Sequence, residues 1–259
     1  MRIPVRRLIG LLSLVLLKSN AGAVSPSFGP ASYSTQNFGS PVDDRALHSF
    51  ALADLLEYRP KGSDSDARWD IKGWTGGDYN RLWFRSEGLH SIASKSAYNA
   101  DFELLYGRFV GRYYDIQVGA RAETQRFEQR NVARGHAVIA LTGLSPYGFE
   151  VEPEFFVSQK GDVSARFTAA KDLMVTQRWV LQPRLDTSVA AQKVPEFTTG
   201  SGLNNVELGL RLRYEIRREL APYVGITFER SFAETASLVR QEGGDPSQFR
   251  FVLGARLWF

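Results

Sequence analysis

Three glutamates, Glu150, Glu152 and Glu154, occupy alternate positions in one short segment. In an extended strand, alternate side chains share a face and lie about 6 to 7 Å apart, so the three carboxylates form a row. Carboxylates this close repel one another unless positive charge lies nearby. The arginines that alternate onto matching faces of other segments are Arg166, Arg184, Arg211 and Arg213. The row therefore either recruits a metal cation or is neutralised by arginines.

Three histidines complete the candidate ligands, because the chain has no cysteine and thiolate ligands are excluded. His136 shares a strand face with Thr142 and is expected to point inward, which makes it the best imidazole candidate. His48 is expected at the start of the first strand, where an ordinary polar strand end is the alternative. His90 is expected at a loop tip. The candidate metal ligands are thus His136, His48 and the glutamate row.

A hydrolytic site has weak support in the same residues. Nucleophilic catalysis needs a hydroxyl or thiol beside a histidine that a third group orients. His48 and Ser49 are adjacent and point to opposite faces of a strand. The residues two positions after the other histidines are the apolar Ile92 and Val138. The sequence therefore argues against an enzyme.

Strands must position these residues, because the chain alternates between apolar and polar positions in segments separated by Gly, Pro, Asn and Asp. The expected strands are residues 47–58, 67–75, 79–87, 97–110, 113–126, 134–144, 149–158, 163–172, 178–190, 203–216, 221–231 and 248–259. Short connections alternate with mostly longer ones, which is typical of bacterial outer-membrane barrels. We therefore predict an all-β fold, a transmembrane antiparallel β-barrel of about twelve strands that spans residues 45–259.

The two ends of the chain support export to that membrane. The final strand alternates strictly and stops at Phe259, which resembles the sorting signal of outer-membrane barrels. At the other end, basic residues precede an apolar run at 8–17 and the small residues at 21–23. The run is about half the length of a membrane-spanning helix, so residues 1–23 are interpreted as a signal peptide. Residues 24–44, rich in Ser, Pro, Gly and Asn, are expected to be a flexible periplasmic leader.

Charge and facing give further expectations. The signal peptide carries four bases and no acid, so without it acidic and basic residues are equal in number and nucleic acid is not an expected partner. Alternation places Leu210 outward and Arg211 inward, whereas Asp54 falls on the lipid face of a weak first strand.

Aromatic residues at the short-turn ends are expected to form an interfacial girdle: Trp74, Tyr79, Phe109, Tyr113, Tyr114, Tyr147, Phe149, Trp179, Tyr223, Trp258 and Phe259. A soluble β-sandwich is the alternative.

Several segments resemble the copper resistance protein B family of outer-membrane proteins. The segments are WTGGDYNRLW at 74–83, FVSQKGDVSAR at 156–166, TQR at 176–178 with QPR at 182–184, and ELGLRLRYEIRRELAPYVG at 207–225. The resemblance implies a barrel in the outer-membrane lipid that binds copper ions or passes them between periplasm and exterior. It also implies a role in copper tolerance and suggests a periplasmic copper-handling protein as partner.

The chain departs from the family pattern in its leader. Typical members carry a Met- and His-rich segment before the barrel, but residues 24–44 contain neither residue, and Met174 is the only methionine outside the signal peptide. Oxygen and imidazole donors suit Cu(II) better than Cu(I), so copper is expected to meet His136, His48 and the glutamate row. A small nonspecific channel is the main rival, although such porins usually have about sixteen strands.

Overall fold

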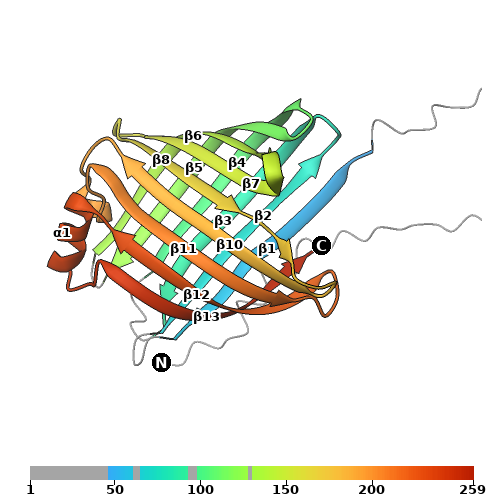
Figure 1. Cartoon of the computed structure of the whole chain (residues 1–259). Helices are drawn as coiled ribbons and strands as arrows, with labels where there is room; N and C mark the ends of the chain where they lie inside the picture. Colours follow the sequence, from blue (N-terminus) through green and yellow to red (C-terminus); the bar gives the residue numbers. More distant parts are fainter. Residues whose placement is uncertain (1–45, 61–64, 93–97, 128–129) are drawn as a thin grey trace, which may run out of the picture. The chain divides into compact units, whose positions relative to one another are not determined.

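The computed structural model describes residues 46–60, 65–92, 98–127 and 130–259. The expected signal peptide and leader, residues 1–44, lie outside these residues. The described part forms one antiparallel sheet that closes into a barrel, because β1 pairs with both β2 and β13 (Figure 1). The strands are β1 (His48–Arg59), β2 (Asp66–Gly76), β3 (Asn80–Ser91), β4 (Tyr98–Gly111), β5 (Tyr114–Phe127), β6 (Arg130–Ser145), β7 (Phe149–Ser158), β8 (Val163–Ala170), β9 (Leu173–Met174), β10 (Trp179–Ala190), β11 (Gly202–Tyr214), β12 (Leu220–Ser231) and β13 (Ser247–Trp258).

These thirteen segments make twelve barrel strands. β8 and β9 pair with β10 in one continuous register and are separated only at residues 171–172. Pro183 lies opposite this gap and has no N–H to donate, although its carbonyl accepts a bond from the Lys171 N–H at 3.1 Å. The predicted twelve-stranded barrel is therefore confirmed. β6 begins at Arg130, so the long connection expected at 127–133 is wrong.

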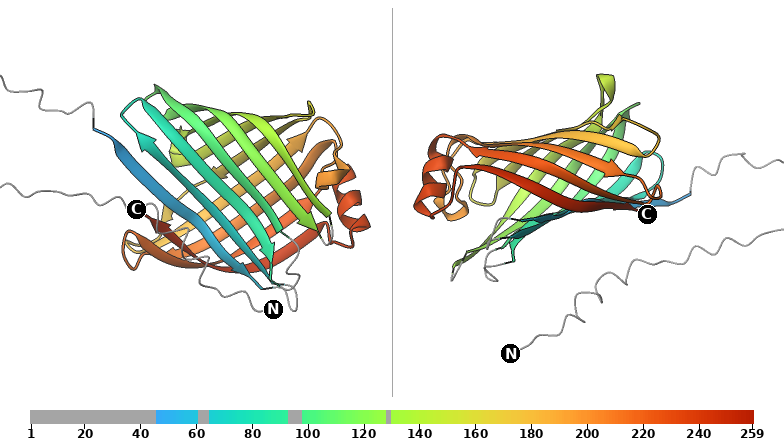
Figure 2. Two further views of the ribbon diagram at one scale, coloured as in Figure 1. Left: turned by 180° about the vertical axis from the view of Figure 1, so that it is seen from behind. Right: turned by 60° about the horizontal axis from the view of Figure 1, so that its bottom comes forward.

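The two ends of the barrel differ in their connections. The turns after β2, β4, β6, β9 and β11 are short, and the last strand ends beside them; we call this the short-turn end. The opposite end, the loop end, carries η4 (Pro195–Phe197) and α1 (Ala233–Gln241) in the two longest described connections, as Figures 1 and 2 show. The described residues contain no helix long and apolar enough to cross a membrane. In outer-membrane barrels, short turns face the periplasm and longer loops face the exterior.

The alternation of faces follows the expectation. Leu208 and Leu210 point outward and are exposed, whereas Glu207 and Arg211 are buried inside the barrel. On β13 the outward Phe251 is 64 % exposed. An outer surface of uncovered apolar side chains around a charged interior is the arrangement that a bilayer requires and that a soluble sandwich reverses.

Asp54 is an exception that the alternation did not predict. The pairing of β1 with both neighbours shifts register just after Ala53, so one extra residue is inserted into the strand. Such a β-bulge turns the following side chains to the other face. Asp54 keeps the inward phase of Phe50 and Leu52 and is buried in the lumen, not on the lipid face. After the bulge, Glu57 and Arg59 point inward as well. The weak appearance of this strand in the sequence reflects the change of phase.

The aromatic girdle is only partly as predicted. Tyr79, Tyr113 and Tyr147 are exposed at the short-turn end, but Tyr223 is buried inside the barrel. Trp74 and Trp258 also point inward and belong to a group of rings that we call the aromatic cluster. Its members are Phe50, Trp74, Trp83 and Trp258, with successive ring centroids 6.3 to 6.4 Å apart. The cluster fills one side of the lumen at the short-turn end.

Candidate functional site

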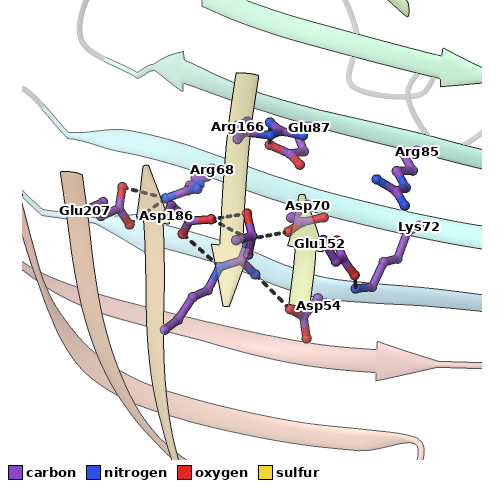
Figure 3. A network of polar contacts seen from close by, with 12 residues as sticks. Asp54, Arg68, Asp70, Lys72, Arg85, Glu87, Glu152, Arg166, Asp186 and Glu207 are labelled. Atoms are coloured by element: carbon purple, nitrogen blue, oxygen red, sulfur yellow. Dashed lines mark hydrogen bonds and ion pairs between the residues drawn. The ribbon is translucent and has the colours of Figure 1, made fainter. Parts of the chain in front are cut away.

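Charged side chains fill the middle of the lumen (Figure 3). Arg184 on β10 makes three contacts there: Nη1 donates to Asp54 and Nη2 to Asp70, both at 3.0 Å, and Nε donates to Asp186 at 2.9 Å. Because Asp54 points inward, one guanidinium joins β1, β2 and β10 across the barrel. We call these four residues the Arg184 group.

Two further groups adjoin it. In the first, Arg211 Nε donates to Glu57 at 2.6 Å, while Arg59 and Arg68 both donate to Glu207. In the second, Arg85 and Arg166 both donate to Glu154, Arg166 also donates to Glu87, and Lys72 donates to Glu152 at 2.5 Å. Most lumenal carboxylates therefore already have a cation as partner.

The glutamate row lies inside the barrel, but its members have different surroundings. Glu152 binds Lys72, and Glu154 is buried between Arg85 and Arg166. Glu150 is exposed at the short-turn end. Of the two readings that the sequence left open, neutralisation by bases describes Glu152 and Glu154. Arg166 was among the arginines considered, whereas Lys72 and Arg85 were missed because the sequence does not show which residues of opposite walls meet.

The two candidate histidines lie far apart. His48 is exposed at the short-turn end, beside Gly76, whereas His136 is buried on β6 nearer the loop end. His90 belongs to β3 and not to a loop tip as expected. Within the described ranges, no group of three or more His, Asp or Glu residues has the geometry to hold a metal ion. Metal binding by His136, His48 and the glutamate row therefore stays a prediction.

His136 lines a cavity of about 310 Å³ at the loop end, which we call the vestibule. Charged residues from neighbouring strands also line it, among them Asp101, Arg121, Glu123 and Arg134. His136 Nε2 lies 3.7 Å from Glu123 Oε2, and Arg134 Nε donates to the same oxygen at 2.6 Å. His136 Nδ1 has no hydrogen-bond partner among the described residues, although the side chain is buried. Buried nitrogens without a partner are rare in proteins, and a bound ion is one of the explanations for them.

Glu123 is the functional candidate that the sequence could have supplied. It alternates onto the inward face of β5 with Arg121, and Arg121 pairs directly with His136. Glu123 is thus diagonal to His136 across one ladder, within reach of a long side chain. The pairing of neighbouring strands was the signal that would have found it.

Ser158 also faces His136, directly across the β6–β7 ladder. Its hydroxyl donates to Asp162 at 2.9 Å and accepts the N–H groups of Lys160 and Asp162. The hydroxyl is thus occupied in the β7–β8 turn, and His136 has no bond to it. This arrangement lacks the nucleophile–base contact of a hydrolase.

Comparisons with known proteins agree with the barrel and with one family. A family model described as "Copper resistance protein B precursor (CopB)" matches residues 47–259. Copper resistance protein B of Escherichia coli is 37 % identical over 221 residues, covering 85 % of this chain and 73 % of that protein. A homologue from Pseudomonas syringae pv. tomato is 37 % identical over 225 residues, covering 87 % of this chain and 74 % of its own. Among solved structures, the NanC porin superposes with a TM-score of 0.51 at 12 % identity, covering 81 % of this chain and 99 % of the porin. The last likeness concerns the fold alone.

Proposed function

Because the chain belongs to the copper resistance protein B family, we propose that its barrel binds Cu(II) in the vestibule on a path between exterior and periplasm. A role in copper resistance and a place in the outer membrane follow from the family and the fold. Family membership also supports a non-enzymatic role. The finer part of the proposal is the capture of the ion by particular side chains of the vestibule.

The observation that carries the proposal is His136 in the lining of a polar cavity, with its Nε2 facing Glu123 and its Nδ1 without a partner among the described residues. Imidazole nitrogen and carboxylate oxygen are suitable ligands for Cu(II). A ligating histidine usually has its second ring nitrogen directed at a carboxylate, and Nε2 of His136 faces Glu123 in this way. The single methionine of the described part, Met174, is exposed at the short-turn end, whereas the vestibule lies at the loop end. Thioether ligation of Cu(I) is therefore not expected here.

We propose the other candidate residues as later contacts on the same path. Glu152 and Glu154 lie deeper in the lumen, and Glu150 and His48 lie at the short-turn end. Passage of Cu(II) along the row would require it to replace Lys72 at Glu152 and the two arginines at Glu154. Such displacement of bound cations is costly in a buried network. Binding in the vestibule is consequently the part of the function with the best physical support.

Substitution of His136 by Asn is expected to lower copper tolerance toward that of a deletion strain, because the imidazole nitrogen is lost. Zinc and nickel tolerance, measured beside it, should change less, since Cu(II) binds imidazole sites more strongly. Electron paramagnetic resonance of the purified barrel with Cu(II) should lose its nitrogen hyperfine splitting. His90→Asn is the matched control, because His90 is on the outward side of β3 at the same end. Full tolerance and unchanged nitrogen splitting in His136→Asn would exclude this histidine as a ligand.

The glutamate row can be tested by a single substitution at Glu150. A triple change to Gln would leave Lys72 and Arg85 without their acids, so a loss of tolerance would be confounded by misfolding. Glu150→Gln removes one exposed charge. It breaks no ion pair, because Glu150 has no cation within 4 Å among the described residues. A partial loss of tolerance with normal membrane insertion is expected. Unchanged tolerance would remove Glu150 from the path.

The two rival functions, a nonspecific channel and an enzyme, predict different experimental results. A nonspecific channel would let liposomes that contain the barrel swell in sugar solutions, whereas a lumen crossed by the Arg184 group should give little swelling. An enzyme of the outer membrane would release fatty acid from phospholipid. Neither result is expected for a copper-specific barrel.

A further inference from the structure

The connection between β12 and β13 at the loop end carries three acids, Glu234, Glu242 and Asp245. Two acids bind the β10–β11 loop: Glu234 accepts the Ser201 N–H at 3.1 Å and its hydroxyl at 2.8 Å, and Glu242 accepts the Thr198 hydroxyl at 2.9 Å. Both hydrogen bonds lower the pKa of Glu234, the backbone N–H of Ser201 more than its hydroxyl. Both carboxylates are therefore used on the side of α1 that faces this neighbouring loop.

The other side of α1 forms a pocket of about 450 Å³ that contains two arginines and no acid. We call it the rim pocket; besides Arg230 and Arg240 it is lined by Phe232, Ala233, Ala236 and Ser247. Ala233, Ala236 and Arg240 are spaced at three and four residues and thus share one helix face. Neither Arg230 nor Arg240 has a carboxylate within 4 Å among the described residues. Asp245 adjoins the pocket, but its carboxylate accepts the Ser247 N–H at 2.9 Å and pairs with neither arginine within 4 Å. The pocket lining therefore carries two positive charges without an ion-pair partner.

Two local features strengthen this positive character. The guanidinium of Arg230 lies over the ring of Phe232, 5.5 Å from its centroid, which holds it at the edge of the pocket. α1 begins at the pocket, and Phe232, its N-cap residue, provides no side-chain cap. The first N–H groups of an uncapped helix carry partial positive charge and favour an anion. Glu234 in the first turn offsets part of this charge, so the two arginines supply most of the positive character.

The rim pocket lies at the top of the apolar belt of β12 and β13. Arg230 is the last outward residue of β12, and Phe228 and Ile226 precede it on the same face. Their partners on β13 are Phe249 and Phe251, both exposed on the lipid side. The outward rings lie on the membrane side of the two arginines. This arrangement matches a molecule that has acyl chains and an anionic head group. Long basic side chains at such a border normally place their charge at the head-group level.

We propose that the rim pocket binds the phosphorylated head group of an outer-leaflet glycolipid, with its acyl chains against Phe228, Phe249 and Phe251. Arginine forks bind phosphate with paired hydrogen bonds, which makes two free guanidinium groups a fitting receptor. Basic pockets at membrane borders bind lipid head groups by the same chemistry. This site lies outside the lumen and is independent of copper binding. It would fix the barrel to the lipid of its own leaflet at the α1 loop.

The test compares binding of two lipids by the purified full-length barrel in detergent. Bisphosphorylated lipid A is the ligand, and lipid A without phosphates is its matched control. Loss of charge-assisted hydrogen bonds to phosphate should weaken binding by about tenfold or more, so the wild-type barrel should prefer the phosphorylated lipid by that factor. Equal affinity for both lipids would overturn the proposal, whatever the behaviour of any variant.

The variant Arg230→Ala with Arg240→Ala should lose the preference for phosphate. Arg126→Ala is the control, because Arg126 is an exposed outward arginine at the loop end of β5 and is not part of the pocket. Native mass spectrometry can count bound lipid, and the heat-dependent gel shift of folded barrels reports folding. A similar loss in Arg126→Ala would mean that general surface charge attracts the lipid, and the rim pocket would then not be a site.

Discussion

Replacing Arg184 by Leu is expected to destabilise the barrel by about 3 to 5 kcal/mol, the usual cost of removing one partner from a buried ionic group. The guanidinium bridges three carboxylates from three strands. Asp54 would keep Arg256 at 2.9 Å, but Asp70 would have no cation within 4 Å in the described structure. Urea unfolding of the barrel in phospholipid vesicles, followed by the gel shift, measures the change in free energy.

Two further variants separate charge from volume in the Arg184 group. Arg184→Lys keeps the charge but cannot reach three acids with one ammonium, so an intermediate loss of stability is expected. Arg184→Leu leaves both Asp70 and Asp186 without a cation within 4 Å in the described structure, although Asp186 still accepts the Thr168 hydroxyl at 2.7 Å. Adding Asp70→Asn removes the less satisfied of these two carboxylates and should restore part of the stability. A double variant as unstable as Arg184→Leu alone would show that the unpaired charge of Asp70 is not the source of the loss.

Leu210→Arg is expected to cost about 2 to 4 kcal/mol, because it places a charge on the lipid face near the middle of β11. Leu210 is 40 % exposed and pairs with Pro183 and Ile226, whose side chains belong to the same apolar belt. Arg211, which alternation places inward, could be replaced by Leu with a mild effect unless the change leaves an inward acid unpaired. That condition is met in part, because Arg211 is 1 % exposed and its Nε donates to the fully buried Glu57, which would keep only Arg59 as its cation.

The two substitutions should therefore differ in how they can be rescued. Arg59 remains 3.0 Å from Glu57 after Arg211→Leu, which limits the loss, and Glu57→Gln should reduce it further by removing the excess negative charge. Glu57→Gln should not rescue Leu210→Arg, whose cost arises in the lipid. The same unfolding experiment decides between these expectations. Rescue of Leu210→Arg, or failure to rescue Arg211→Leu, would contradict the assignment of the faces.

Alternation in the sequence was sufficient to predict the strands, their faces and the closure of the barrel. It failed at Asp54, because a bulge changes the phase within a strand and leaves no separate mark in the pattern. At Trp258 alternation was correct, because Trp258 shares the inward face with Arg256. The residue was nevertheless assigned to the membrane interface because it is a tryptophan. Residue type was a weaker guide to facing than position.

The candidate site was less predictable than the fold. Glu123 and His136 meet across one ladder, so strand pairing alone could have brought them together. Lys72 and Glu152 meet across the lumen, and that contact depends on the tilt and stagger of strands that are distant in sequence. Such contacts follow from the closed geometry of the barrel. This is why the row of glutamates was visible in the sequence while the cations that bind it were not.

The aromatic cluster provides the chain with an optical reporter of its periplasmic end. Three of the five tryptophans, Trp74, Trp83 and Trp258, belong to it, so much of the intrinsic fluorescence arises there. Paramagnetic Cu(II) quenches indole emission only at short range. Copper held beside His136 in the vestibule should leave this emission largely intact, whereas copper that has reached the short-turn end should quench it. The time course of quenching after copper is added at the loop end would therefore follow transit through the barrel without any attached dye.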